Sequence, residues 1–145
     1  MAKKALIVYA SITGNTEKIA MKFKEVIERK GKPWGDWECD VFKANKYSYK
    51  ENPPYYAEDY DLICVGAPIW AGIPPLYLYD DHQGVLMKML GPKSGQRVRT
   101  PHSQPYSSKK GVAFVTYGGD RRGTEEALPA LQCIQLRLED ARIKC

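Results

Sequence analysis

The chain contains several short, continuous apolar segments, and each is rich in β-branched or aromatic residues. The strongest runs cover residues 5–10, 61–66 and 111–117, and such runs are typical of parallel strands that are buried on both faces. A weaker run at residues 38–43 follows a Gly-containing turn and predicts one more strand. The pattern therefore predicts four strands, of which residues 5–10 form the first.

Apolar residues at helical spacing separate these runs. Residues 19–27 predict an amphipathic helix after the first strand, and a further helix is expected between Pro75 and about residue 90. Thr124 offers capping chemistry for a last helix, with Pro129 expected in its first turn. The residues expected on the buried face of that helix are Leu128, Leu131, Ile134 and Leu138.

Alternation of strands and helices favours an α/β fold with a doubly wound parallel sheet and helices on both faces, a three-layer arrangement. Residues 1–145 are expected to form a single domain, because this length suits one hydrophobic core. Residues 45–59 predict irregular structure with one short helix. The polar segment 92–110 is long for a connection, which predicts either a loop with a function of its own or a mobile loop.

Composition is ordinary for a soluble globular protein, with 43% hydrophobic and 27% charged residues. No apolar run approaches the ~20 residues of a membrane span, and the basic start has no cleavage-site pattern behind it. We therefore expect a cytoplasmic protein without a membrane interaction. The net charge of +5 is compatible with an acidic partner, a nucleic acid or a phosphorylated cosubstrate, and does not by itself select one. Nucleic acid is not expected, because no basic helix or RNA-binding aromatic motif is present.

The cysteines have no metal-binding spacing. None forms a C-x-x-C pair and only two histidines could join them, so no metal site is expected. Cys64 lies within an apolar strand pattern and is expected to pack as a small hydrophobe.

The turn after the first strand has the chemistry of a phosphate site. It supplies three hydroxyls, an amide and a glycine at the start of a helix, whose N-terminus favours negative charge. Neither G-x-x-x-x-G-K-[ST] nor G-x-G-x-x-G is present, so a phosphomonoester fits better than a triphosphate or a dinucleotide. The residues are Ser11, Ile12, Thr13, Gly14, Asn15 and Thr16.

This turn resembles the loop that binds the phosphate of FMN in flavodoxins. Two later loops, after the third and fourth strands, are similar to the loops that enclose the isoalloxazine ring in that family. The resemblance implies FMN as cofactor, a strand order of 2-1-3-4-5 and no catalytic residues. The cofactor-binding residues that it implies in the later loops are Ala67, Pro68, Ile69, Trp70, Ala71, Gly72, Thr116, Tyr117, Gly118, Gly119 and Asp120.

By this resemblance, Trp70 would lie against one face of the ring. Tyr117 and residues 118–120 would line the other side and the pyrimidine edge. Gly72, or the peptide between Trp70 and Ala71, is the candidate for a bond to the flavin N5 that adjusts with the redox state, because glycine changes peptide orientation at little steric cost.

Two features depart from the family. Flavodoxins are strongly acidic, whereas this chain is positively charged, so we expect a redox partner protein that is acidic and a less negative flavin potential. The sequence also stops at Cys145, where the family continues through a fifth strand and a final helix. We expect a fragment or truncated gene product; the alternative is a short fifth strand with an exposed edge that pairs with a second copy as a homodimer.

Three functions remain open from the sequence. An FMN electron carrier is favoured, because no residue stands out as a catalytic acid, base or nucleophile. The first alternative is an FMN-dependent oxidoreductase that takes hydride from NAD(P)H and reduces quinones or similar acceptors. Arg121, Arg122 or the basic segment 92–110 would then hold a cosubstrate phosphate. The second is a non-redox signalling or phosphatase domain, which lacks its expected aspartate or cysteine here.

Overall fold

The computed structural model describes nine segments of the chain, and they contain a four-stranded sheet in which all neighbouring strands are parallel. The strand order is β2-β1-β3-β4, so the expected order of these four strands is confirmed. The described segments are residues 3–11, 14–33, 35–45, 53–69, 74–79, 84–90, 108–116, 123–140 and 143–145. The strands are β1 (Lys3–Ala10), β2 (Trp37–Ala44), β3 (Leu62–Pro68) and β4 (Lys110–Thr116).

The central position of β1 explains its uninterrupted apolar sequence. It is hydrogen-bonded to β2 on one side and to β3 on the other, with Ile7 opposite Val41 and Cys64. Its six residues from Ala5 to Ala10 are all buried. A strand covered on both faces has no polar face to present to water, which produces a continuous run rather than an alternating one.

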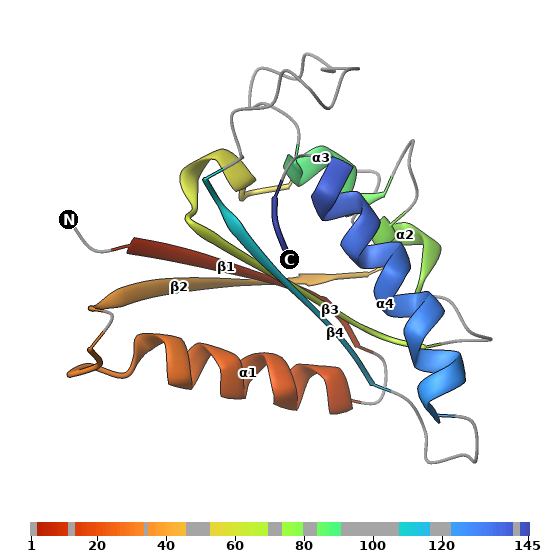
Figure 1. Cartoon of the computed structure of the whole chain (residues 1–145), viewed down its shortest axis with the longest axis horizontal. Coiled ribbons are helices and arrows are strands. Elements are labelled where there is room, and N and C mark those ends of the chain that lie inside the picture. The colour runs from red at the N-terminus through yellow and green to blue at the C-terminus, as the bar shows by residue number, and fades with distance from the viewer. Residues whose placement is uncertain are drawn as a thin grey trace.

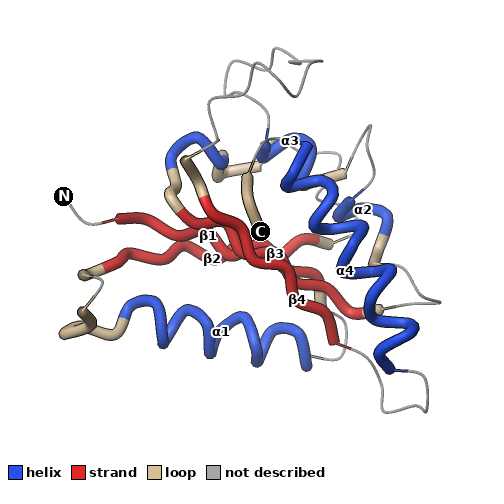
Figure 2. Tube along the Cα trace, in the orientation of Figure 1, coloured by secondary structure: helices blue, strands red, loops and turns tan. Residues whose placement is uncertain are grey.

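Helices cover both faces of the sheet, and Figure 1 shows α1 on one face and the other helices on the opposite face. The same layers are seen in Figure 2, where the sheet lies between the two groups of helices. The three-layer arrangement expected from the sequence is therefore confirmed. The helices are α1 (Asn15–Glu28), α2 (Leu76–Tyr79), α3 (Val85–Leu90) and α4 (Gly123–Asp140), with the short 3-10 helix η2 (Ala57–Asp59) before β3.

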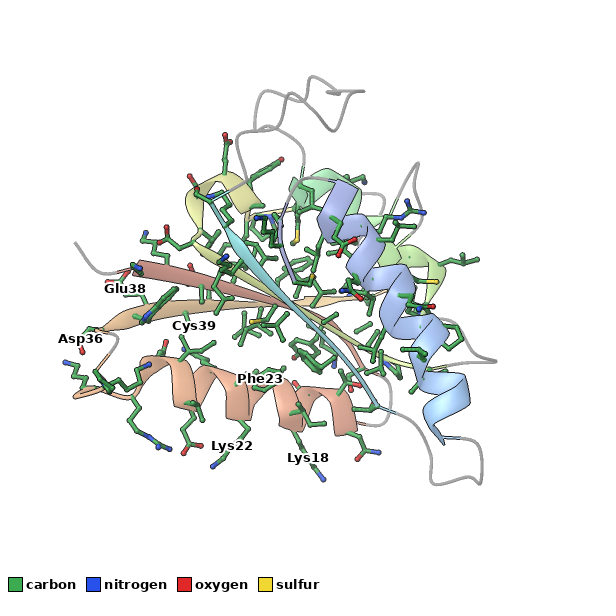
Figure 3. All side chains as sticks on the ribbon, in the orientation of Figure 1. Lys18, Lys22, Phe23, Asp36, Glu38 and Cys39 are labelled. Carbon is green, nitrogen blue, oxygen red and sulfur yellow. The ribbon has the colours of Figure 1, made fainter. Side chains whose placement is uncertain are left out.

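Each face has its own hydrophobic core. On the α1 face, Ile7, Tyr9 and Cys64 pack with Phe23 of α1, and Figure 3 shows Phe23 between the helix and the sheet while Lys18 and Lys22 point away. On the other face, Leu6 and Val8 of β1 belong to a larger cluster that includes buried residues of α2, α3 and α4. Alternate residues of β1 thus supply both cores. Cys64 packs in the first core, as expected.

Four sequence expectations need correction. β3 continues through Pro68, beyond the expected end at residue 66. Instead of one helix between residues 75 and 90 there are two short ones, α2 and α3; the polar sequence between them ends in Gly84, which has low helix propensity.

Helix α4 accounts for the other two corrections. It begins at Gly123, so Pro129 lies inside the helix rather than in its first turn. Its fully buried face contains Ala130, Ile134 and Leu138, whereas Leu128 is 52% exposed. Burial of that face offsets the roughly 3 kcal/mol by which an interior proline destabilises a helix.

Beyond β4, the described residues contain one isolated bridge and no named fifth strand. Lys144 pairs with Lys110 in the parallel sense, and the Gly111 amide donates to the Lys144 carbonyl oxygen over 2.6 Å. The buried Ile143 precedes this bridge, and its amide donates to the Leu138 carbonyl oxygen at 3.0 Å. The bridge lies where the expected order would place a fifth strand.

Candidate functional site

The site begins where β1 ends and α1 starts. Ser11 directly follows β1, and its Oγ accepts a 3.1 Å hydrogen bond from the Gly14 amide. Gly14 is the N-cap of α1 and has φ +88°, a left-handed conformation that glycine adopts without the strain of a Cβ. Among the described residues, its chain neighbours aside, none has a heavy atom within 4 Å of the place where a Cβ would stand. The backbone of this turn is thus open to a ligand on the Gly14 side.

The N-terminus of α1 presents donors to this opening. The first bond that closes a helical turn runs from the Lys18 amide to the Gly14 carbonyl oxygen, 3.1 Å long. The amides of Asn15, Thr16 and Glu17 lie before this bond, in the first turn, where an α-helix supplies no carbonyl acceptor of its own. Together with the helix dipole they form a positive end that suits an anion.

Thr16 connects the loop after β1 to the end of strand β4. Its side chain is only 1% exposed, and its Oγ1 lies 2.8 Å from Oγ1 of Thr116, the last residue of β4. The two residues are 100 positions apart in the sequence. This hydrogen bond holds the start of α1 against the end of β4.

Thr116 also connects to the second loop. Its carbonyl oxygen accepts a 2.9 Å hydrogen bond from the amide of Ile69, the first residue after β3. The segment 117–120, which contains the third predicted loop, follows Thr116 directly. Among the described residues, Thr16 of the first predicted segment and Ile69 of the second are thus both hydrogen-bonded to Thr116, the first residue of the third.

A second contact network ties the first turn of α1 to β1 and β2, and the sequence did not reveal it. Tyr9 donates from its hydroxyl to Oε1 of Glu17 at 2.9 Å, while the Lys43 Nζ lies 4.0 Å from Oε2 of the same carboxylate. Burial, followed by the hydrogen bond and the charge of Glu17, raises the pKa of Tyr9 to about 12. The phenol is therefore a fixed donor near neutral pH. Strand alternation does place Tyr9 on the face of Ile7, which could have identified it as a partner for α1.

The predicted site residues fall into three groups. Ser11, Gly14, Asn15 and Thr16 are brought together at the start of α1, and Ile69 and Thr116 join them through the bonds above. Ala67 and Pro68 belong to β3 rather than to a loop, and Ala67 is fully buried in the core. The predicted residues that lie outside the described segments are Ile12, Thr13, Trp70, Ala71, Gly72, Tyr117, Gly118, Gly119 and Asp120.

Reactive side chains are not prominent in the described part of the chain. Burial raises the pKa of Cys39 to about 11 and that of Cys64 to about 12, so both thiols stay protonated and unreactive near neutral pH. Among the described residues, no group of three or more His, Cys, Asp or Glu side chains could hold a metal ion. No helix in these segments is both long and apolar enough to cross a membrane.

The donors at the start of α1 match a phosphate monoester. The hydroxyls of Ser11 and Thr16 and the first amides of α1 are neutral donors that can saturate phosphate oxygens, and the open position beside Gly14 leaves room for close approach. This loop can therefore bind a small anionic group. The described residues Ile69 and Thr116, from which the two later predicted loops start, are connected to this helix start by the hydrogen bonds above, at the strand ends where doubly wound folds bind larger ligands.

No protein-family model matches the sequence, and no curated protein matches it. Solved structures do match in fold. Oxidised Flavodoxin 1 from Bacillus cereus is 21% identical, with 99% of this chain and 78% of that chain covered and a TM-score of 0.59. The flavodoxin, WrbA-like protein from Agrobacterium tumefaciens is 16% identical, with 99% and 76% covered and a TM-score of 0.59.

A third structure, a flavoprotein from Lactobacillus acidophilus in complex with FMN, is 21% identical, with 99% of this chain and 89% of that chain covered and a TM-score of 0.54. These identities are low, so the comparisons bear on the fold. The strand order and the three layers are those of a doubly wound sheet of the flavodoxin type. The chain therefore has the flavodoxin-like fold, with its candidate site at the carboxyl ends of the strands.

Proposed function

We propose that this protein binds FMN at the carboxyl ends of its strands and serves as an electron carrier. The observation that carries the proposal is the convergence of three strand-end segments on Thr116, beside a helix start with neutral phosphate donors. The likeness to flavodoxins, and to a flavoprotein whose structure contains FMN, supports this assignment.

The described residues fit the phosphate of such a cofactor. Ser11 and Thr16 would donate hydroxyl bonds, and the amides at the start of α1 would complete the phosphate contacts. The ring would lie between the loop that begins at Ile69 and the loop that follows Thr116. Bound FMN would supply reversible one- and two-electron chemistry, while these loops would hold the ring and limit its contact with water.

Electron transfer is favoured over a substrate reaction because the described site holds few groups able to move protons. Its hydroxyls are poor acids, and the Tyr9 phenol has a pKa near 12. The buried thiols of Cys39 and Cys64 belong to the core and not to the site. The net charge of +5 supports an acidic protein as the redox partner.

A flavin titration tests the binding proposal. Apoprotein is titrated with FMN and, separately, with riboflavin, and the quenching of flavin and tryptophan fluorescence is followed. Tight binding of FMN with much weaker binding of riboflavin is expected, because only FMN carries the phosphate. If neither flavin binds, or both bind equally well, the assigned phosphate site is wrong.

A second experiment separates the carrier from the reductase. NADPH is mixed rapidly with the FMN-loaded protein without oxygen, and the flavin absorbance is recorded. An electron carrier should bleach slowly with NADPH and quickly with a chemical reductant such as dithionite. Fast, saturable bleaching by NADPH would instead establish the NAD(P)H-dependent oxidoreductase alternative.

A further inference from the structure

The Thr16 hydroxyl forms a 2.8 Å hydrogen bond with the hydroxyl of Thr116. Thr16 is almost fully buried, so solvent does not readily replace this partner. A hydroxyl has one proton to donate and lone pairs with which to accept. The 2.8 Å contact can therefore run in either direction, with Thr16 or Thr116 as the donor.

A phosphate at the start of α1 removes this freedom. Because the oxygens of a phosphate dianion are acceptors only, Thr16 can bond to one of them only by donating its proton. Its oxygen must then accept the proton of Thr116. The bonds form a directed chain in which Thr116 donates to Thr16 and Thr16 donates to the phosphate, and each bond in such a chain polarises the next.

We propose that Thr116 is a positioning residue that orients the Thr16 hydroxyl toward the phosphate and so favours phosphorylated over non-phosphorylated flavin. This inference rests on the proposed FMN site. Thr116 acts without touching the phosphate, through a residue 100 positions away in the sequence. The carbonyl bond from Thr116 to the Ile69 amide belongs to the backbone, so a side-chain substitution isolates the role of the hydroxyl.

The proposal predicts a dependence on the ionisation of the phosphate. A phosphate monoester loses its second proton at a pKa of about 6. The dianion accepts charge-assisted hydrogen bonds more strongly than the monoanion, so the contribution of Thr116 should grow between pH 5 and pH 8. A residue that only supported the local fold would contribute equally at both values.

The test compares Thr116→Val with Thr116→Ser. Valine keeps the shape of the side chain and removes the hydroxyl, whereas serine keeps the hydroxyl. The dissociation constants for FMN and riboflavin are measured by fluorescence at pH 5 and pH 8. At pH 8, Thr116→Val should weaken FMN about three- to tenfold, the effect of one hydrogen bond, with riboflavin unchanged. The weakening should be smaller at pH 5, and Thr116→Ser should restore affinity.

A double-mutant cycle identifies the route of the effect. If Thr116 acts through Thr16, the Thr116→Val substitution should change FMN affinity little in a Thr16→Val background, because the proton it orients is gone. Full additivity of the two substitutions would overturn the proposal. Equal weakening of FMN and riboflavin by Thr116→Val, or no weakening of either, would overturn it as well.

Failure of the proposed function is distinguishable from failure of this inference. If the unaltered protein does not bind FMN, the cofactor assignment fails and the role of Thr116 falls with it. If the unaltered protein prefers FMN to riboflavin and Thr116→Val retains the full preference, the FMN site stands and only the role of Thr116 is refuted.

Discussion

Replacement of Gly66 by alanine should destabilise the protein through a single, identifiable clash. Gly66 lies in β3 beneath the ring of Phe114 in β4, and a Cβ at this position would stand 2.0 Å from Cζ and 2.1 Å from Cε2 of that ring. Carbon atoms in contact normally lie about 3.5–4.0 Å apart. The ring would therefore have to move by about 1.5 Å to admit one methyl group.

The surroundings of Phe114 limit such a movement. The ring meets Phe23 of α1 edge-on, with 4.8 Å between centroids and an interplanar angle of 90°. Overpacking of a core typically destabilises by about 1–3 kcal/mol, and loss of an aromatic pair adds about 0.5–1.5 kcal/mol. We expect Gly66→Ala to lower the free energy of unfolding by about 2–3 kcal/mol, or roughly 6–12 °C in Tm for a domain of this size.

Urea unfolding followed by tryptophan fluorescence measures this change. Gly111→Ala is the matched control in the neighbouring strand, because its Cβ would meet only side-chain atoms at 2.9–3.2 Å, and a smaller loss is expected. Phe114→Ala removes the clashing ring, so the double variant should be no less stable than Phe114→Ala alone. Additive losses in the double variant, or a loss below about 0.5 kcal/mol for Gly66→Ala, would refute the clash.

Two further predictions concern protonation. Because the pKa of Tyr9 is raised to about 12 in the folded state, from about 10 in the unfolded chain, its contribution to stability should be complete below about pH 10 and disappear as the pH rises toward 12. Urea unfolding should show a steeper alkaline loss of stability for the unaltered protein than for Tyr9→Phe; parallel pH profiles would contradict this. The buried Cys39 and Cys64, with pKa values raised by burial, should resist a thiol reagent such as DTNB at pH 8 until the protein is denatured. Rapid labelling of all four cysteines in the folded protein would show that these two are accessible.

The sequence predicts β1 and β3 well because a parallel strand that is covered on both faces must be apolar throughout. β4 was expected to be buried in the same way, but Gly111 is its one buried residue and Val112 is 39% exposed. β1, β3 and β4 are each located to within two residues at either end. The boundary errors of two residues are at the start of β1 and at the end of β3. The second involves Pro68, whose missing amide makes it an unfavourable strand residue in any local pattern. Pro68 takes the last position of β3, opposite Thr116, where the strand does not continue.

Helix α4 shows why the buried face was harder to predict. The pattern favoured the leucines, yet the face that packs on the sheet is built partly from Ala127 and Ala130, with Leu128 turned outward. Small residues let a helix approach a sheet closely, so burial there depends on the fit between the two surfaces. Leu128 and Ala127 differ by about 100° around the helix axis. The periodicity of large residues therefore placed Ile134 and Leu138 correctly on the buried face but placed Leu128 wrongly.

In the candidate site, too, the features that depend on neighbouring residues in the sequence could be predicted, and those that depend on long-range contacts could not. The turn from Ser11 to Thr16 could be predicted because its hydroxyls, its glycine and the helix start are contiguous in sequence. No local pattern connects Thr16 to Thr116, since the two residues are 100 positions apart and meet only in the folded sheet. On our proposal, the topology of the sheet selects the hydroxyl that orients the phosphate donor. The preference for FMN over riboflavin would then depend on this topology as much as on the sequence of the loop.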